Sequence, residues 1–110
     1  MRVFLDDRRT PPDSSWVLVA TPAEAIALLV DGNVTELSLD HDLGLLNADG
    51  QDEATGYDVL LFIEREIVEG TIRFEVPEIT IHSANSAAHD RMLRARNSIY
   101  ARIGREQARR

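Results

Sequence analysis

Ionisable and hydroxyl side chains follow directly after three short apolar runs of this sequence. Residues 3–5 lead into Asp6 and Asp7, residues 37–39 into Asp40, His41 and Asp42, and residues 79–81 into His82 and Ser83. Charged groups at the end of a buried strand are costly in free energy unless they face a solvated crevice. Open parallel sheets bind ligands at the carboxyl ends of their strands, so the pattern predicts a phosphate or metal site.

The acids Asp6, Asp7 and Asp40 form the first candidate group. If the first and third strands are neighbours, these carboxylates meet at one edge of the sheet, and carboxylates with water ligands suit Mg²⁺ or Mn²⁺. Asp42, two residues beyond Asp40, is a fourth candidate metal ligand. The structural alternative is that Asp6 or Asp7 caps a turn before the Pro-Pro loop that follows.

Two histidines, His41 and His82, are candidate general acids or bases. Histidine is the usual proton carrier near neutral pH, and these two of the chain's three histidines follow predicted strand ends. Together they could divide the proton transfers of phosphodiester cleavage, and Asp40 completes the candidate catalytic group. The alternative is that each histidine is only a structural hydrogen-bond donor.

A polar turn and two arginines could hold a phosphate. Ser83, Asn85 and Ser86 lead into the predicted last helix, and the free N–H groups at a helix N-terminus bind anions. Alternatively, Ser86 serves only as the cap of that helix. Arg8 and Arg91 are the cations that could reach an anion from this side, although either can also be an ordinary surface arginine.

The charge distribution limits the partners that we expect. The 110 residues carry a net charge of −7. Residues 1–89 hold 17 acids and 5 arginines, a balance of −12, whereas residues 90–110 hold 2 acids and 7 arginines, a balance of +5. An acidic body argues against extended duplex binding, which depends on phosphate neutralisation. The basic part can contact a small phosphorylated ligand, dock on the acidic body, or be a solvated helix face.

Missing residue types exclude further chemistries. All 12 basic residues are arginine, which excludes the lysine of a P-loop and Schiff-base chemistry. The chain has no cysteine, so it forms neither disulfides nor a thiolate zinc site. No window approaches the roughly 18 apolar residues of a membrane span, and the N-terminus shows no signal-peptide pattern. We therefore expect a cytoplasmic protein of bacterial or phage type.

Short apolar runs alternate with amphipathic segments along the chain. Strands are predicted over residues 2–5, 16–20, 34–39 and 78–82. Helices are predicted to follow the caps Thr21, Thr55 and Ser86, the last helix covering about 86–104 before a basic tail over 105–110. The alternation indicates one α/β domain over residues 1–110. The connection over 7–15 is too short for a helical crossover, so either an irregular loop replaces the helix or residues 16–20 pair in another way.

Four motifs, in this order, resemble the cyclic-phosphate processing receiver domain family. They are Leu5-Asp6-Asp7-Arg8 with Pro11-Pro12, Leu37-Ser38-Leu39-Asp40-His41-Asp42-Leu43-Gly44, Thr55-Gly56-Tyr57-Asp58, and Ile81-His82-Ser83-Ala84-Asn85 with Met92. The similarity spans most of residues 3–92. It implies a receiver-like or flavodoxin-like α/β fold: a three-layer sandwich with a mostly parallel four-stranded sheet in the order 2-1-3-4. The first helix and the fifth strand of ordinary receivers are absent.

The resemblance also implies roles for single residues. In ordinary phospho-receivers an acidic pair follows the first strand, an aspartate acceptor ends the third, a hydroxyl ends the fourth and a lysine ends the fifth. By motif, Asp6 and Asp7 match the pair, Asp40 the acceptor and Ser83 the hydroxyl. The chain has no lysine, and histidines flank the acceptor and hydroxyl positions. The family therefore implies a site for cyclic phosphates more than a phosphorelay.

The leading hypothesis is a phosphodiesterase-like enzyme that processes the cyclic phosphate of a nucleotide or an RNA end. Asp6, Asp7 and Asp40 would hold Mg²⁺ or Mn²⁺, and a metal-free variant that uses the histidine pair alone stays open. The partner would be a small phosphorylated ligand or a nucleic-acid end, with no membrane involved. Two alternatives remain: a non-catalytic binding module for a phosphorylated ligand or protein partner, and a phospho-acceptor receiver.

Overall fold

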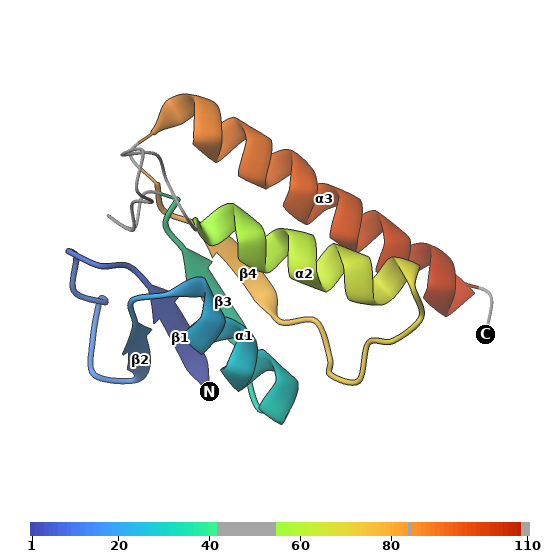
Figure 1. Ribbon diagram of the computed structural model, residues 1–110, viewed down its shortest axis with the longest axis horizontal. Coiled ribbons are helices and arrows are strands. Elements are labelled where there is room, and N and C mark those ends of the chain that lie inside the picture. Colours follow the sequence, from blue (N-terminus) through green and yellow to red (C-terminus); the bar gives the residue numbers. More distant parts are fainter. Residues whose placement is uncertain (42–54, 84, 109–110) are drawn as a thin grey trace, which may run out of the picture.

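The computed structural model describes residues 1–41, 55–83 and 85–108, which contain a four-stranded parallel sheet (Figure 1). The strands are β1 (Arg2–Leu5), β2 (Trp16–Val19), β3 (Glu36–Leu39) and β4 (Glu78–Ile81), in the order β2-β1-β3-β4. Every pairing is parallel. The predicted receiver-like α/β fold class and its strand order are confirmed, and three of the strands are one or two residues shorter than predicted.

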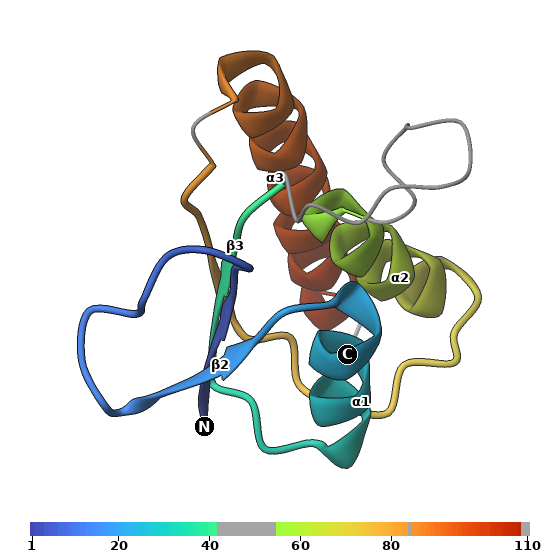
Figure 2. The ribbon, with the colours of Figure 1, turned by 60° about the vertical axis from the view of Figure 1, so that its left-hand side comes forward.

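Residues 6–15 connect β1 to β2 without a helix or a strand. β2 nevertheless pairs in parallel with β1, with Arg2 opposite Trp16 and Leu5 opposite Val19. Of the two predicted alternatives, the irregular loop is therefore correct. The loop passes on the side of the sheet that faces away from the helices (Figure 2).

Three helices, α1 (Pro22–Asp31), α2 (Gly56–Val68) and α3 (Ser86–Ala108), follow β2, β3 and β4. α3 is longer than predicted, so residues 105–108 of the predicted tail belong to the helix. α1 ends at Gly32, whose φ of 90° is a left-handed conformation that glycine adopts without strain. Within the described residues, no helix is long and apolar enough to cross a membrane.

Polar side chains cap the N-termini of the helices. As predicted, Thr21 caps α1, because its hydroxyl accepts the N–H of Glu24 at 3.2 Å. The N-cap of α3 is Asn85, whose Oδ1 accepts the N–H of Ala88 at 3.1 Å. The predicted cap at Ser86 is therefore wrong, and Ser86 is the first residue of the helix. Asparagine and serine cap helices about equally well, so residue type alone could not separate the two positions.

All three helices lie on one face of the sheet (Figures 1 and 2). Alternate strand residues point toward them and form the buried core, including Val3, Leu5, Leu37, Leu39 and Ile79. The described residues therefore form two layers rather than the three of the expected sandwich. The physical reason is that residues 6–15 connect β1 to β2 without a helix, and that the three helices of the described residues all pack on the other face.

α2 begins directly against the end of β3. The N–H of Gly56 donates to the carbonyl of His41 at 3.4 Å. A Cβ at Gly56 would lie 1.9 Å from the carbonyl oxygen of Asp40, which is a severe steric overlap. Glycine is therefore required for this close approach, and the approach fixes the backbone of Asp40 at the strand exit.

Replacing Gly56 by alanine is expected to lower the free energy of unfolding by about 1–3 kcal/mol, the usual cost of overpacking. Gly104→Ala in α3 is the matched control, because a Cβ there meets no atom within 4 Å and alanine favours a helix by up to about 1 kcal/mol. Urea unfolding measures both variants. A Gly56→Ala protein as stable as the wild type would contradict the close approach.

Candidate active site

Asp6, Asp40 and His82 emerge from adjacent strand ends at one edge of the sheet. The N–H of Asp40 donates to the carbonyl of Leu5 at 3.0 Å, and the N–H of His82 donates to the carbonyl of Leu39 at 2.9 Å. These bonds continue the parallel ladder by one residue beyond β3 and β4. The backbone therefore holds the three side chains in fixed relative positions.

The carboxylate of Asp6 is the most heavily bonded group of the site. Its Oδ1 accepts the N–H groups of Arg8 and Arg9 at 2.8 and 2.9 Å, and its Oδ2 lies 3.1 Å from Nε2 of His82. Burial opposes ionisation, but the two N–H donors and His82 outweigh it, so the pKa of Asp6 is lowered. Asp6 caps the turn after β1, as the structural alternative proposed, and stays ionised.

Three carboxylates gather at this edge. Asp6, Asp7 and Asp40 each offer one oxygen, and these oxygens all lie within 4.8 Å of one another. Burial and then the negative charge of Asp6 raise the pKa of Asp40, although the N–H of His41 donates to its Oδ1 at 2.9 Å. Hard oxygen donors at this spacing fit the ligand preference of Mg²⁺ and Mn²⁺. Asp42, the fourth predicted ligand, lies outside the described residues.

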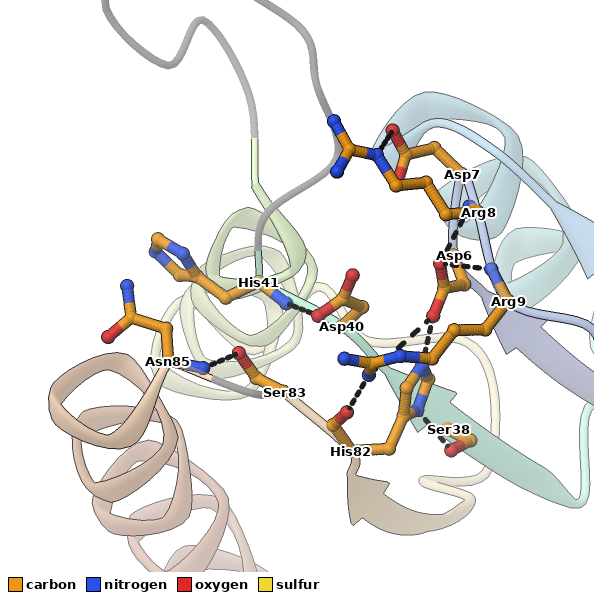
Figure 3. A network of polar contacts seen from close by, with 10 residues as sticks. All are labelled: Asp6, Asp7, Arg8, Arg9, Ser38, Asp40, His41, His82, Ser83 and Asn85. Carbon is orange, nitrogen blue, oxygen red and sulfur yellow. Dashed lines mark hydrogen bonds and ion pairs between the residues drawn. The ribbon is translucent and has the colours of Figure 1, made fainter.

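The imidazole of His82 is held on both sides by the protein (Figure 3). Its Nδ1 lies 2.6 Å from the hydroxyl of Ser38, its Nε2 bonds to Asp6, and its ring stacks on Phe4 with centroids 4.3 Å apart. Burial lowers the pKa of His82 against the opposing effect of Asp6. Because a carboxylate only accepts hydrogen bonds, the neutral ring donates from Nε2 to Asp6 and accepts the Ser38 hydroxyl at Nδ1.

Sequence reasoning did not identify Ser38 as a site residue. It lies between two core leucines of β3, and the alternation of a strand places it on the face opposite to theirs. No helix of the described residues covers that face (Figure 2), and His82 packs over Ser38 and leaves it only 5% exposed. The signal was present in the sequence as a hydroxyl within an apolar strand next to a predicted site.

His41 points to another part of the site. Its ring is directed away from His82 and toward the side of Asn85 (Figure 3). The structure therefore does not bring the two predicted proton carriers together as a pair. Asp40, the third member of the predicted catalytic group, lies between the two histidines (Figure 3).

The predicted phosphate ligands are only partly gathered. Ser83 and Asn85 are neighbours, since the Ser83 hydroxyl accepts the N–H of Asn85 at 3.2 Å. Ser86 is exposed in the first turn of α3, and Arg91 is exposed one turn further along. The Arg8 side chain is 86% exposed and lies 3.9 Å from Asp7, so it turns away from the space between the strand ends.

Arg9, which sequence reasoning missed, occupies the place expected of Arg8. Its guanidinium donates to the carbonyl of His82 and lies 3.9 Å from Oδ2 of Asp6. The two arginines are adjacent in sequence, and only the turn closed by Asp6 decides which of them faces the acids. No pattern of residue types contained that information.

Replacing Ser38 by alanine is expected to cost about 1–3 kcal/mol of stability, because it leaves a buried ring nitrogen without its partner. The ¹⁵N chemical shift of His82 Nδ1 should then move toward that of an imidazole nitrogen that accepts no hydrogen bond, while Asp6 keeps the proton on Nε2. Thr80→Ala is the matched control, since Thr80 pairs with Ser38 in the sheet but is exposed. Unchanged His82 shifts in Ser38→Ala would count against the assigned bond.

The comparisons agree with this architecture. The family model described as cyclic-phosphate processing Receiver domain matches residues 1–98. No curated protein and no solved structure is significantly similar to the chain. The matched region includes all four strands and the acids, histidines and arginines described above. The chain therefore belongs to the cyclic-phosphate processing receiver domain family.

Proposed function

We propose that this chain hydrolyses a cyclic phosphate, in the manner of a phosphodiesterase, at the carboxyl edge of its sheet. The observation that carries the proposal is the cluster of Asp6, Asp7 and Asp40, whose oxygens lie within 4.8 Å and beside the guanidinium of Arg9. Acids that hold a cation, together with a fixed positive charge, are the usual means of stabilising a reacting phosphate. The family name indicates the cyclic class of phosphate.

The three carboxylates would hold Mg²⁺ or Mn²⁺. Asp40 has an oxygen to offer, because the N–H of His41 engages only its Oδ1. Asp40, whose pKa burial and Asp6 raise, would ionise fully on ligating a cation. The bound cation would stabilise negative charge on the phosphate oxygens and lower the pKa of a water ligand.

Hydrolysis adds one water to the cyclic phosphate. A bond forms between phosphorus and the water oxygen, one P–O bond of the ring breaks, and the released oxygen takes up a proton to give a phosphomonoester. In this proposal, Asp40 would orient the water as a ligand of the cation, the water releases its proton to solvent, and His41 donates a proton to the leaving oxygen. His82 acts through Asp6, because Ser38 and Asp6 engage both of its ring nitrogens.

Binding without turnover is the second candidate, and the contacts of His82 favour it. A site in which one predicted proton carrier is fully engaged by Ser38 and Asp6 can hold a phosphate and leave it intact. The ligand in both candidates is a small phosphorylated molecule or a nucleic-acid end. Turnover therefore separates the two.

A panel of 2′,3′-cyclic and 3′,5′-cyclic nucleotides, incubated with the purified chain and Mn²⁺, tests the proposal by chromatography of the products. We expect conversion of at least one member to a phosphomonoester and loss of turnover on chelation. Folded wild-type protein that converts no member, with its fold checked by circular dichroism, would contradict hydrolysis. Turnover that persists under chelation would support hydrolysis but contradict a role for the cation in it.

Asp7→Asn is the sharpest variant for the same assay, because Asp7 is the exposed member of the cluster and its described contact is with the exposed Arg8 side chain. Turnover and Mn²⁺ affinity, the latter measured by electron paramagnetic resonance, are both expected to fall at least about tenfold, the equivalent of about 1.4 kcal/mol. The control is Asp31→Asn, an exposed acid at the end of α1. Equal losses of turnover and Mn²⁺ affinity in the two variants would contradict a role for Asp7 in the site.

A further inference from the structure

Arg9 is the arginine that the turn after β1 directs toward the acids. Its backbone N–H is fixed by Oδ1 of Asp6 at 2.9 Å, and its guanidinium crosses to the exit of β4, where it donates to the carbonyl of His82. The side chain is 48% exposed. It is thus anchored at two points and still open to a ligand from solvent.

The guanidinium has more donors than these contacts use. Arginine carries five N–H donors in a planar fork, and the described contacts of Arg9 with His82 and Asp6 both involve a single terminal nitrogen, Nη1. The other edge of the fork is directed at the space between Asp40 and Ser83 (Figure 3). A planar edge with two parallel donors matches the oxygens of a phosphate.

The charges of the site require such a cation. An anion that approaches Asp6, Asp7 and Asp40 is repelled by three carboxylates, and one divalent cation neutralises only two of them. Arg8 lies 3.9 Å from Asp7 on the exposed side, and Arg9 supplies the positive charge beside Asp6. The chain has no lysine that could take this role.

We propose that Arg9 binds the non-bridging oxygens of a phosphate group through the edge of its guanidinium that faces Asp40 and Ser83. Arg8 precedes Arg9 in the same turn, but its side chain is 86% exposed and takes no part in this binding. The inference rests on the proposed function for the class of ligand, a phosphate, but it does not require hydrolysis.

Isothermal titration of inorganic phosphate into the full chain with Mg²⁺ tests this assignment. Arg9→Gln keeps a polar side chain of shorter reach and removes the charge and the fork, and we expect it to weaken phosphate binding at least tenfold. Arg9→Lys retains the charge without the fork and should recover only part of the affinity. Arg8→Gln and the exposed, distant Arg73→Gln match the change in net charge, and both should bind within about twofold of wild type.

Thermal unfolding of the same variants separates binding from a purely structural role. If Arg9→Gln melts at a lower temperature but the folded protein binds phosphate as wild type does, Arg9 is only a clamp between strand ends and the proposal is overturned. A loss of affinity equal to that in Arg8→Gln, or a wild-type chain that binds no phosphate at millimolar concentration, would also overturn it.

The outcomes also distinguish this inference from the proposed hydrolysis. If phosphate binding depends on Arg9 but the chain converts no cyclic nucleotide, the role of Arg9 is supported and the proposed hydrolysis is contradicted. If the chain hydrolyses a cyclic nucleotide but its phosphate affinity does not change in the Arg9 variants, the role of Arg9 is contradicted and the proposed hydrolysis stands. The two claims therefore fail separately.

Discussion

The buried carboxylate of Asp6 is the interaction on which the rest of the site depends. One of its oxygens closes the turn after β1 by accepting hydrogen bonds from two backbone N–H groups. The other accepts a hydrogen bond from Nε2 of His82. This turn also decides that Arg9, and not Arg8, reaches Asp6 and the exit of β4. A single ionised group thus connects the exit of β1 to the exit of β4 and sets the orientation of a histidine and an arginine.

The missing layer of the fold has a direct consequence for this chemistry. Because none of the helices in the described part of the chain covers the face of the sheet that carries Phe4 and Ser38, the ring of His82 packs there and reaches both of them. The irregular loop that replaces the first helix delivers Arg9 to the same edge. The loss of the first helix and the arrangement of the site are therefore linked, because the open face accommodates side chains that a covering helix would displace.

Much of the architecture could be predicted from the sequence, because strand ends and helix caps leave local patterns. The convergence of Asp6, Asp40 and His82 follows from strand order alone, once parallel neighbours are assumed. Arg9 and Ser38 could not be assigned in this way, because their roles depend on how one turn closes and on which face of the sheet is left open. A hydroxyl within an apolar strand marks Ser38 in the sequence, but tertiary packing decides what that hydroxyl bonds and where the Arg9 side chain turns.

A ¹³C titration of the aspartate carboxyl groups in the metal-free chain tests the central claim most directly. The account predicts that the pKa of Asp6 lies below the ordinary value of 3.8, because backbone N–H donors and His82 outweigh burial. It predicts that the pKa of Asp40 lies above 3.8, because burial and the charge of Asp6 prevail there. The reverse order, or two carboxyls that titrate together at the ordinary value, would contradict it.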